Sequence, residues 1–247
     1  MNDYKDDCRA KKTIGILGGM GPKATIYLFD CIVRLTKAEK DSDHIPIIVF
    51  NNPKIPDRTA AILHGGPSPL PLLIEGARFL EKSGADFIVM PCITAHYFYT
   101  EIIKHIKIPF LHALEVTALH IEKQLPTFKK VGLLSTTGTI ETRIFQDLMA
   151  KKGIEVVIPD TSYRMQVMDA IYGKKGIKAG FSEAPKKIFL DVVAHLIEEK
   201  GSRALIAGCT EIPLALQPRD ISIPLIDPLQ IIALRAIEDG GCQPVKP

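Results

Sequence analysis

One stretch of sequence decides the fold: Ala85-Asp86-Phe87-Ile88-Val89-Met90-Pro91-Cys92-Ile93-Thr94-Ala95-His96. Its apolar run, Phe87–Met90, is short and continuous, which is typical of a strand buried on both faces. A proline and a cysteine end this run, and a polar turn follows. Because strands buried on both faces occur mainly in parallel sheets covered by helices, the stretch predicts an α/β protein.

Similar runs lie on either side of this strand. We expect further strands at Ile14–Leu17, Ile45–Phe50 and Phe110–Leu111. Apolar residues recur at three- and four-residue spacing over Pro22–Lys40 and Leu72–Lys82, which predicts helices there. Strands that alternate with helices indicate a mainly parallel sheet flanked by helices on both faces.

The second half of the chain repeats the first. Arg203-Ala204-Leu205-Ile206-Ala207-Gly208-Cys209-Thr210-Glu211 has the same order of strand, cysteine and polar turn, and its cysteine lies 117 residues after Cys92 (209 − 92 = 117). The same step relates Gly15 to Gly132, Gly21 to Gly138 and Gly84 to Gly201. Such a step is too long for a solenoid unit. It indicates two similar α/β domains related by a pseudo-twofold axis, with the active site in the cleft between them.

The repeat also predicts how the domains divide. We expect the last helix of each copy to pack on the other copy, so that the domains are discontinuous. The predicted N-terminal α/β domain is 13–113 plus 228–240, and the second α/β domain is 114–227. Residues 1–12 and 241–247 are expected to be flexible tails, and Asp3-Tyr4-Lys5-Asp6-Asp7 resembles part of an epitope tag.

The composition narrows the class of protein. The 247 residues are 46% hydrophobic and 24% charged, with a net charge of +3, which is typical of a globular protein. The charges are interspersed, so we expect no nucleic acid partner. No apolar run approaches the roughly 20 residues of a membrane helix, so no membrane partner is expected. The polar first residues differ from a secretory signal, which predicts a cytoplasmic location.

The five scattered cysteines are then expected to be free thiols, because the cytoplasm keeps thiols reduced.

Two cysteines have a setting that suggests chemistry. Ligands of open α/β sheets bind beyond the carboxyl ends of the strands, so Cys92 and Cys209 would face one ligand from opposite sides. Such a pair suits inversion at a carbon acid, because one thiolate can remove the α-proton while the other thiol protonates the opposite face. A helix amino terminus after each cysteine would favour the thiolate. Cys8, Cys31 and Cys242 lack this setting and are interpreted as packing residues.

At these residues the chain resembles a known family. Met90–His96 and Gly208–Glu211 are similar to the two cysteine signatures of the aspartate/glutamate racemase superfamily. The likeness extends to three further blocks, Gly15–Pro22, Asn52–Thr59 and Ile177–Gly180, of which the last two resemble the aspartate racemase branch. The resemblance implies a racemase that interconverts L- and D-aspartate without pyridoxal phosphate, with Cys92 and Cys209 as the catalytic pair. It implies no cofactor, no metal and a homodimer.

The resemblance also implies residues that bind the substrate. Arg58 would grip the side-chain carboxylate by a two-pronged contact, and Lys178 would be a second cation. Glu211 would accept a hydrogen bond from the substrate ammonium, or it would raise the pKa of the Cys209 thiol. The full predicted set is Met20, Asn52, Arg58, Thr59, Ile93, Thr94, Thr137, Thr139, Lys178, Thr210 and Glu211. Without the resemblance, the cations would be read as solvated surface charges and the threonines as helix caps.

One residue departs from the family pattern. Members usually have asparagine after the first cysteine, where this chain has Ile93. The amide that would bind the substrate is missing, and only the backbone N–H remains. We therefore expect altered affinity or specificity. His96 follows on the same helical face as Cys92, either as a group that tunes the thiol or as a packed, capping histidine.

Other functions compete with the aspartate racemase. Within the superfamily these are a racemase of glutamate or of broader specificity, and a maleate isomerase or an arylmalonate-type decarboxylase. Gly19–Ala24 fits a dinucleotide fingerprint, weakened by Pro22 and by Asn51-Asn52 in place of an acidic residue. Cys92, His96 and Cys209 would suit a catalytic zinc. The non-enzyme alternative is a two-lobed amino-acid binding protein.

Overall fold

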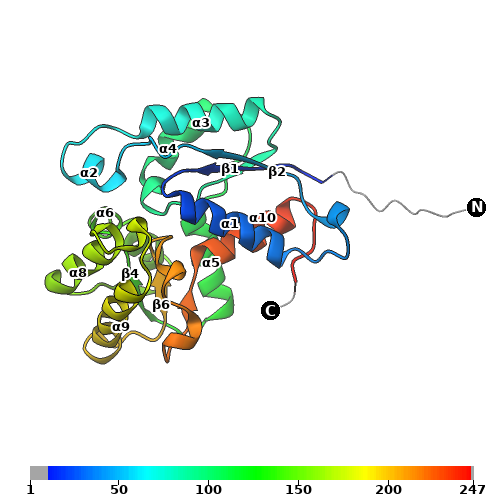
Figure 1. Ribbon diagram of the computed structural model, residues 1–247. Helices are drawn as coiled ribbons and strands as arrows, with labels where there is room; N and C mark the ends of the chain where they lie inside the picture. Colours follow the sequence, from blue (N-terminus) through cyan, green and yellow to red (C-terminus); the bar gives the residue numbers. More distant parts are fainter. Residues whose placement is uncertain (1–10, 246–247) are drawn as a thin grey trace, which may run out of the picture.

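A computed structural model describes residues 11–245 and shows two parallel sheets, one in each half of the chain (Figure 1). The first sheet contains β1 (Ile14–Gly18), β2 (Ile47–Asn51) and β3 (Phe87–Val89), in the order β2-β1-β3. The second contains β4 (Lys130–Leu134), β5 (Glu155–Val157), β6 (Leu205–Ala207) and β7 (Leu225–Ile226), in the order β5-β4-β6-β7. All pairs of neighbouring strands are parallel, so the predicted α/β class is confirmed.

The two sheets repeat one another strand by strand. Phe110 extends the first sheet by a single parallel bridge to Ile88, at the place that β7 occupies beside β6. The predicted strand at Phe110–Leu111 is therefore reduced to this bridge, with the Leu111 N–H donating to the Ile88 carbonyl at 2.9 Å. The order of strands along the chain is the same in both halves, as the repeat requires.

Close packing explains why glycine recurs in the first strand of each copy. A Cβ on Gly15 would lie 2.9 Å from the Cβ of Ala85, and one on Gly132 would lie 2.8 Å from Oγ of Ser202. Ala85 and Ser202 are themselves 117 residues apart (202 − 85 = 117). The repeat in the sequence is thus a repeat of packing contacts, because any side chain at these glycines would push the neighbouring segment away.

The helices cover both faces of each sheet. Those of the first half are α1 (Pro22–Leu35), α2 (Arg58–Leu63), α3 (Leu70–Lys82), α4 (Tyr99–Ile102) and α5 (Ala113–Gln124). Those of the second half are α6 (Thr137–Glu141), α7 (Ile144–Ala150), α8 (Thr161–Tyr172), α9 (Glu183–Glu198) and α10 (Pro228–Asp239). Short 3₁₀ helices lie at Asp41–Asp43, Thr94–Phe98, Ile103–His105, Ile177–Ala179, Ile212–Leu214 and Pro218–Asp220. In Figure 1, α3 covers one face of the first sheet, and α1 and α10 cover the other.

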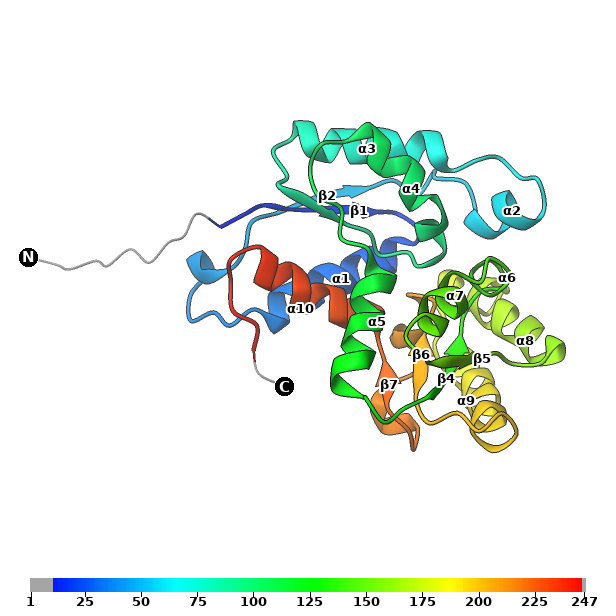
Figure 2. The same cartoon turned by 180° about the vertical axis from the view of Figure 1, so that it is seen from behind.

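One hydrophobic core joins the two halves. A single cluster contains buried residues of β1 and β4 together with α1, α5, α7 and α10, and two outer clusters lie behind the sheets. α10, the last helix of the second copy, packs against α1 and α5 (Figure 2). The packing of a helix from one copy on the other copy agrees with the predicted discontinuous domains. The domain boundaries themselves stay a prediction.

The first helix is shorter than expected. The sequence predicts a helix over Pro22–Lys40, but α1 ends at Leu35 and Thr36 is extended. The Thr36 hydroxyl donates to the Ile32 carbonyl at 2.6 Å, which occupies an acceptor at the end of the helix. β2 likewise begins at Ile47 rather than Ile45, because Pro46 has no N–H to donate to a neighbouring strand.

The C-terminal segment is held in place. Thr36 forms an antiparallel bridge with Pro244, and the Lys37 N–H donates to the Gln243 carbonyl at 2.8 Å. Val245 donates to the Leu35 carbonyl at 2.7 Å. Residues 243–245, which the sequence assigns to a flexible tail, are therefore hydrogen-bonded to the end of α1, and Gly241 and Cys242 donate to carbonyls of α10. Apolar runs alone could not show this contact, because its two partners are far apart in the sequence.

The remaining cysteines pack as expected where the structure describes them. Cys31 is fully buried in α1, and Cys242 lies against the central core. Cys8 lies outside the described residues. Over residues 11–245, no helix combines the length and the apolar character needed to cross a membrane.

Candidate active site

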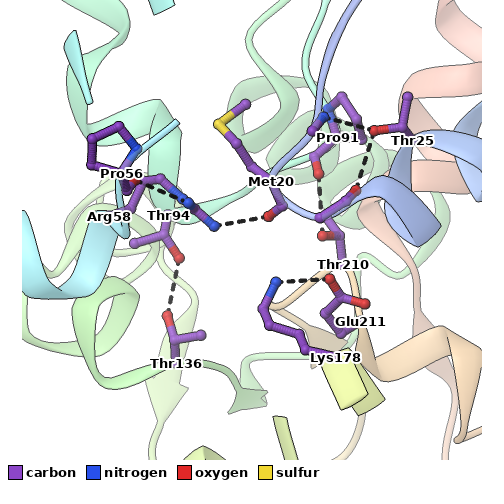
Figure 3. A network of polar contacts seen from close by, with 12 residues as sticks. Met20, Thr25, Pro56, Arg58, Pro91, Thr94, Thr136, Lys178, Thr210 and Glu211 are labelled. Carbon is purple, nitrogen blue, oxygen red and sulfur yellow. Dashed lines mark hydrogen bonds and ion pairs between the residues drawn. The ribbon is translucent and has the colours of Figure 1, made fainter. Parts of the chain in front are cut away.

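The structure brings the two cysteine turns into contact. Cys92 follows the carboxyl end of β3, and Cys209 follows the carboxyl end of β6. The Thr210 hydroxyl donates to the Pro91 carbonyl at 3.2 Å, so the residue after one cysteine is bonded to the residue before the other (Figure 3). Both cysteines are almost completely buried, with 5% and 8% of their surfaces exposed. Equivalent turns of the two halves thus face each other.

The helices after the cysteines begin as short 3₁₀ turns, and the first of them continues directly into α4. These turns cover Thr94–Phe98 after Cys92 and Ile212–Leu214 after Cys209. A short 3₁₀ turn aligns few peptide groups, so it provides a smaller dipole than an α-helix. The expected helix termini are therefore present as 3₁₀ turns at the start of each helical segment.

A cavity of about 310 Å³ lies between the two halves. Its lining from the first half is Gly19, Gly21, Pro22, Lys23, Pro53, Ile55, Asp57 and Arg58. Its lining from the second half is Tyr172, Lys178 and Glu211. Five of these residues, Lys23, Asp57, Arg58, Lys178 and Glu211, are charged and carry both signs, as a site for a small zwitterion would.

Arg58 is buried at the start of α2, which Asp57 caps by accepting from the Ala60 N–H at 2.8 Å. Its Nη1 donates to the Pro56 carbonyl at 3.0 Å, and its Nη2 donates to the Met20 carbonyl at 2.9 Å (Figure 3). Both terminal nitrogens therefore hold loop carbonyls in place. The expected two-pronged contact with a substrate carboxylate stays a prediction. Arg58 would have to make it through its remaining N–H groups, or after a rearrangement that releases one of these carbonyls.

The guanidinium of Arg58 remains charged in spite of its burial. Burial alone would lower the pKa of Arg58, but the nearby Cys92 sulfur and Tyr172 phenol raise it above its ordinary value. Arg58 therefore places a permanent positive charge beside Cys92.

Lys178 and Glu211 form an ion pair in the cavity, with Nζ and Oε1 2.9 Å apart (Figure 3). Glu211 is 2% exposed, and its Oε2 is buried without a hydrogen-bond partner among the described residues. Lys178 also lies over the ring of Tyr172, 5.4 Å from the centroid. Because buried acceptors nearly always have a donor, the free oxygen of Glu211 marks a place for a donor from a ligand.

The glycine turn before α1 faces this carboxylate. A Cβ on Gly21 would lie 2.9 Å from Oε1 of Glu211, and Pro22 has no N–H. A dinucleotide pyrophosphate needs free N–H groups at this turn. It would meet a negative charge there instead, so the geometry disfavours the dinucleotide alternative.

Cys209 is held in its protonated form. Burial raises the pKa of its thiol to about 12, and the charge of Glu211 adds to the rise while Lys178 opposes it. The direction that the sequence predicts for Glu211 is thus confirmed, although burial is the larger cause. In the free protein, Cys209 is an acid at neutral pH.

Three buried hydroxyls connect the halves beside Cys92. Thr94 Oγ1 lies 3.0 Å from Thr136 Oγ1 and 2.9 Å from Thr139 Oγ1, and the last two are 3.2 Å apart. We call Thr94, Thr136 and Thr139 the threonine ring. Thr136 was missing from the predicted set, although the 117-residue step pairs it with Gly19 of the other glycine loop. Thr137 is outside the ring, and its backbone N–H donates to the Met168 sulfur at 3.3 Å.

The other predicted residues have different surroundings. Met20 is buried and uses its carbonyl for Arg58, and Asn52 Oδ1 accepts from the Lys54 N–H at 2.9 Å. Thr59 is buried with no hydrogen-bond partner for its hydroxyl among the described residues. The side chain of Ile93 is buried in the central core, so it does not replace the missing amide.

His96 is a packed histidine that caps backbone groups. Its Nδ1 lies 2.9 Å from the Cys92 carbonyl, and its Nε2 accepts from the Ala113 N–H at 3.2 Å. Burial lowers the pKa of His96 to about 3, and His112 adds to this effect, so the ring is neutral. Because Nε2 uses its lone pair on Ala113 and Nδ1 must carry the hydrogen, His96 offers no nitrogen to the zinc site considered above.

Sequence reasoning missed Tyr172 and Lys23, which both line the cavity. Burial raises the pKa of the Tyr172 phenol, and the charge of Cys209 adds to the rise. Tyr172 ends α8 shortly before the Lys178 block, but no spacing rule connects it with either cysteine. Lys23 lies inside the Gly19–Ala24 block, whose sequence pattern indicates only a glycine fingerprint.

Comparison with known proteins agrees with this geometry. The sequence profile of the Asp/Glu/hydantoin racemase family matches residues 17–236. The chain belongs to this family. The predicted superfamily is therefore confirmed, and the structural neighbours include an aspartate racemase, as the predicted branch implies.

The chain is similar to several proteins that are named as racemases. The broad specificity amino-acid racemase RacX of Bacillus subtilis is 32% identical over 221 residues, which is 87% of this chain and 92% of that protein. The aspartate racemase of Picrophilus torridus has a TM-score of 0.85 at 32% identity, covering 94% of this chain and 96% of its own. A glutamate racemase of Francisella tularensis, in complex with D-glutamate, has a TM-score of 0.67 at 18% identity, which shows the shared fold alone.

Proposed function

We propose that this protein is an amino-acid racemase that interconverts L- and D-aspartate by proton transfer between two thiols, without a cofactor. The observation that carries the proposal is the hydrogen bond between Thr210 and Pro91, which sets the Cys92 and Cys209 turns against each other. The cavity lined by both halves gives a place for the substrate. The aspartate racemase of Picrophilus torridus supports the choice of substrate.

The reaction uses the two thiols in opposite protonation states. For one enantiomer, the Cys92 thiolate takes the α-proton, and the C–H electron pair stays on the substrate as a carbanion. Cys209, which burial and Glu211 keep protonated, then gives its proton to the opposite face of Cα. Cys92 ends as a thiol and Cys209 as a thiolate, so the other enantiomer reacts with the roles exchanged.

The polar groups of the cavity suit the charges of the substrate. The unpartnered oxygen of Glu211 accepts from the substrate ammonium. Lys178 and Arg58, which both line the cavity, make it attractive to the carboxylates of the substrate. An ammonium that shares Glu211 also loosens the hold of this carboxylate on Lys178.

A broader substrate range is the second candidate. It is favoured by Ile93, whose side chain is in the core and leaves no amide to select one substrate. The relative RacX is named for broad specificity. The homodimer and the cytoplasmic location stay predictions, and sizing chromatography of the purified chain tests the first.

The test is isotope exchange in deuterated water. Wild-type protein incubated with L- or D-aspartate should place deuterium on Cα and lose optical activity. Cys92→Ser and Cys209→Ser should each abolish net inversion, whereas Cys242→Ser, at a half-buried cysteine packed against the central core, should retain it. Racemisation that survives in either of the first two variants would refute the two-thiol scheme. Consumption of maleate with no exchange on any amino acid would favour the isomerase alternative.

A further inference from the structure

The cavity contains three cations, and two of them are already engaged. Arg58 donates through both terminal nitrogens to the carbonyls of Pro56 and Met20. Lys178 is paired with Glu211 at 2.9 Å. The third cation is Lys23, whose side chain has no ion pair and no hydrogen bond within residues 11–245. An acidic amino acid differs from a neutral one by one negative charge. Arg58 keeps a nitrogen without a partner, Nε, but this atom is buried, whereas Lys23 is exposed and its ammonium has no partner within residues 11–245.

Lys23 stands where the cavity opens to solvent. It is exposed in the first turn of α1, and it lines both the cavity and an adjoining groove of about 490 Å³. The groove continues over Ile26 and Phe181. Lys23 therefore lies at the border between the cavity and this groove.

Lys23 also reaches across to the second half. Its Nζ lies 3.8 Å from where a Cβ on Gly180 would stand, beside the 3₁₀ helix that carries Lys178. On the same turn as Lys23, a Cβ on Gly21 would lie 3.4 Å from the Nζ of Lys178. Lys23 thus reaches the segment that carries Lys178, and Lys178 reaches the turn that precedes Lys23. The amino terminus of α1 adds its partial positive charge, so an anion at this side of the cavity would be attracted by all three.

We propose that Lys23 binds the side-chain carboxylate of acidic amino acids at the mouth of the cavity and sets the preference for them over neutral amino acids. This inference rests on the proposed racemase function. It gives Lys23 a role in recognition and none in proton transfer, because Lys23 belongs to neither cysteine turn. Lysine is suited to this role, since its flexible stem can follow side chains of different lengths.

The experiment compares acidic substrates with their neutral amides. Wild type, Lys23→Met and Lys23→Arg are assayed for racemisation of aspartate, glutamate, asparagine and glutamine. In Lys23→Met, KM for aspartate and glutamate should rise about fivefold, the scale of one solvent-exposed ion pair, with kcat nearly unchanged. The KM values for asparagine and glutamine should stay the same, and Lys23→Arg should resemble wild type. Lys37→Met removes the same charge from an exposed lysine beyond the other end of α1 and should have no effect.

Two results would overturn the role of Lys23: an unchanged KM for the acidic substrates, or equal losses on acidic and neutral ones. If wild type racemises none of the four amino acids, the proposed function fails separately. Binding of L- and D-aspartate to wild type and Lys23→Met, measured by titration calorimetry, then decides the matter. Weaker binding to the variant supports the carboxylate site, and equal or absent binding rejects it.

Discussion

Glu211 and Lys178 act on the Cys209 thiol in opposite directions. The negative charge of Glu211 disfavours the thiolate, so Glu211→Gln should lower the pKa of Cys209 from about 12. Lys178 favours the thiolate, so Lys178→Met should raise that pKa further. At pH 9 the reactive thiolate fraction changes about tenfold for each pKa unit, so alkylation of Cys209 by iodoacetamide should be faster in the first variant and slower in the second. Mass spectrometry of the Cys209 peptide gives the rate.

The matched control is Glu141→Gln. Glu141 is paired with Arg164 on the surface and does not line the cavity, so its loss should leave the Cys209 rate unchanged. If both cavity variants move the rate in the same direction, the change reflects altered access to the thiol, and the electrostatic account of Cys209 is wrong.

At the scale of elements, the threonine ring ties the 3₁₀ helix Thr94–Phe98 to α6 across the two halves. Thr139→Val keeps the shape of this buried side chain and removes its hydroxyl, which leaves Thr94 and Thr136 with one partner fewer. The free energy of unfolding should fall by about 1–2 kcal/mol, measured by urea denaturation. Combined with Thr94→Val, the loss should be smaller than the sum of the single losses, because both changes break the same ring.

A hydroxyl inside one helix provides the control. Thr117 is as buried as Thr139, but its hydroxyl donates at 2.7 Å to Ala113 within α5. Thr117→Val should therefore add to Thr94→Val without coupling. Equal coupling in the two pairs would show that the ring does not connect these elements energetically.

The whole molecule is expected to unfold as one unit, because the central core includes residues from both sheets. Ile232→Ala, fully buried in α10, should lower the free energy of unfolding by about 2–5 kcal/mol. Hydrogen exchange of the slowest amides should accelerate to the same extent in β1 and β4. Ile26→Ala removes a side chain that is 68% exposed and should change neither. Acceleration confined to β1 would instead support two independent domains.

Much of the fold could be predicted because it depends on patterns that are local or repeated. Short apolar runs identify the strands, and the 117-residue step pairs Gly15 with Gly132 and Cys92 with Cys209. The end of α1 could not be predicted in this way. Leu35 ends the helix where the chain meets residues 243–245, and no local pattern connects segments so far apart.

The site was predicted less completely than the fold. Glu211 beside Cys209 could be expected, because the two residues are neighbours in sequence. Thr136 was passed over in favour of Thr137, since adjacent threonines on a loop have no period that shows which one points at Thr94. Tyr172 comes from a helix end that the sequence connects with neither cysteine.

The α/β class, the family and the place of both cysteines at strand ends can be inferred from the amino-acid sequence alone. These features follow from spacing along the chain and from a repeated pattern. The contacts of the side chains, in contrast, become visible in the folded protein. Arg58 holds backbone carbonyls, Ile93 packs in the core, and Lys23 lines the cavity. The physical reason is that a side chain takes its partners from whatever segments fold against it, and here those segments come from both halves of the chain.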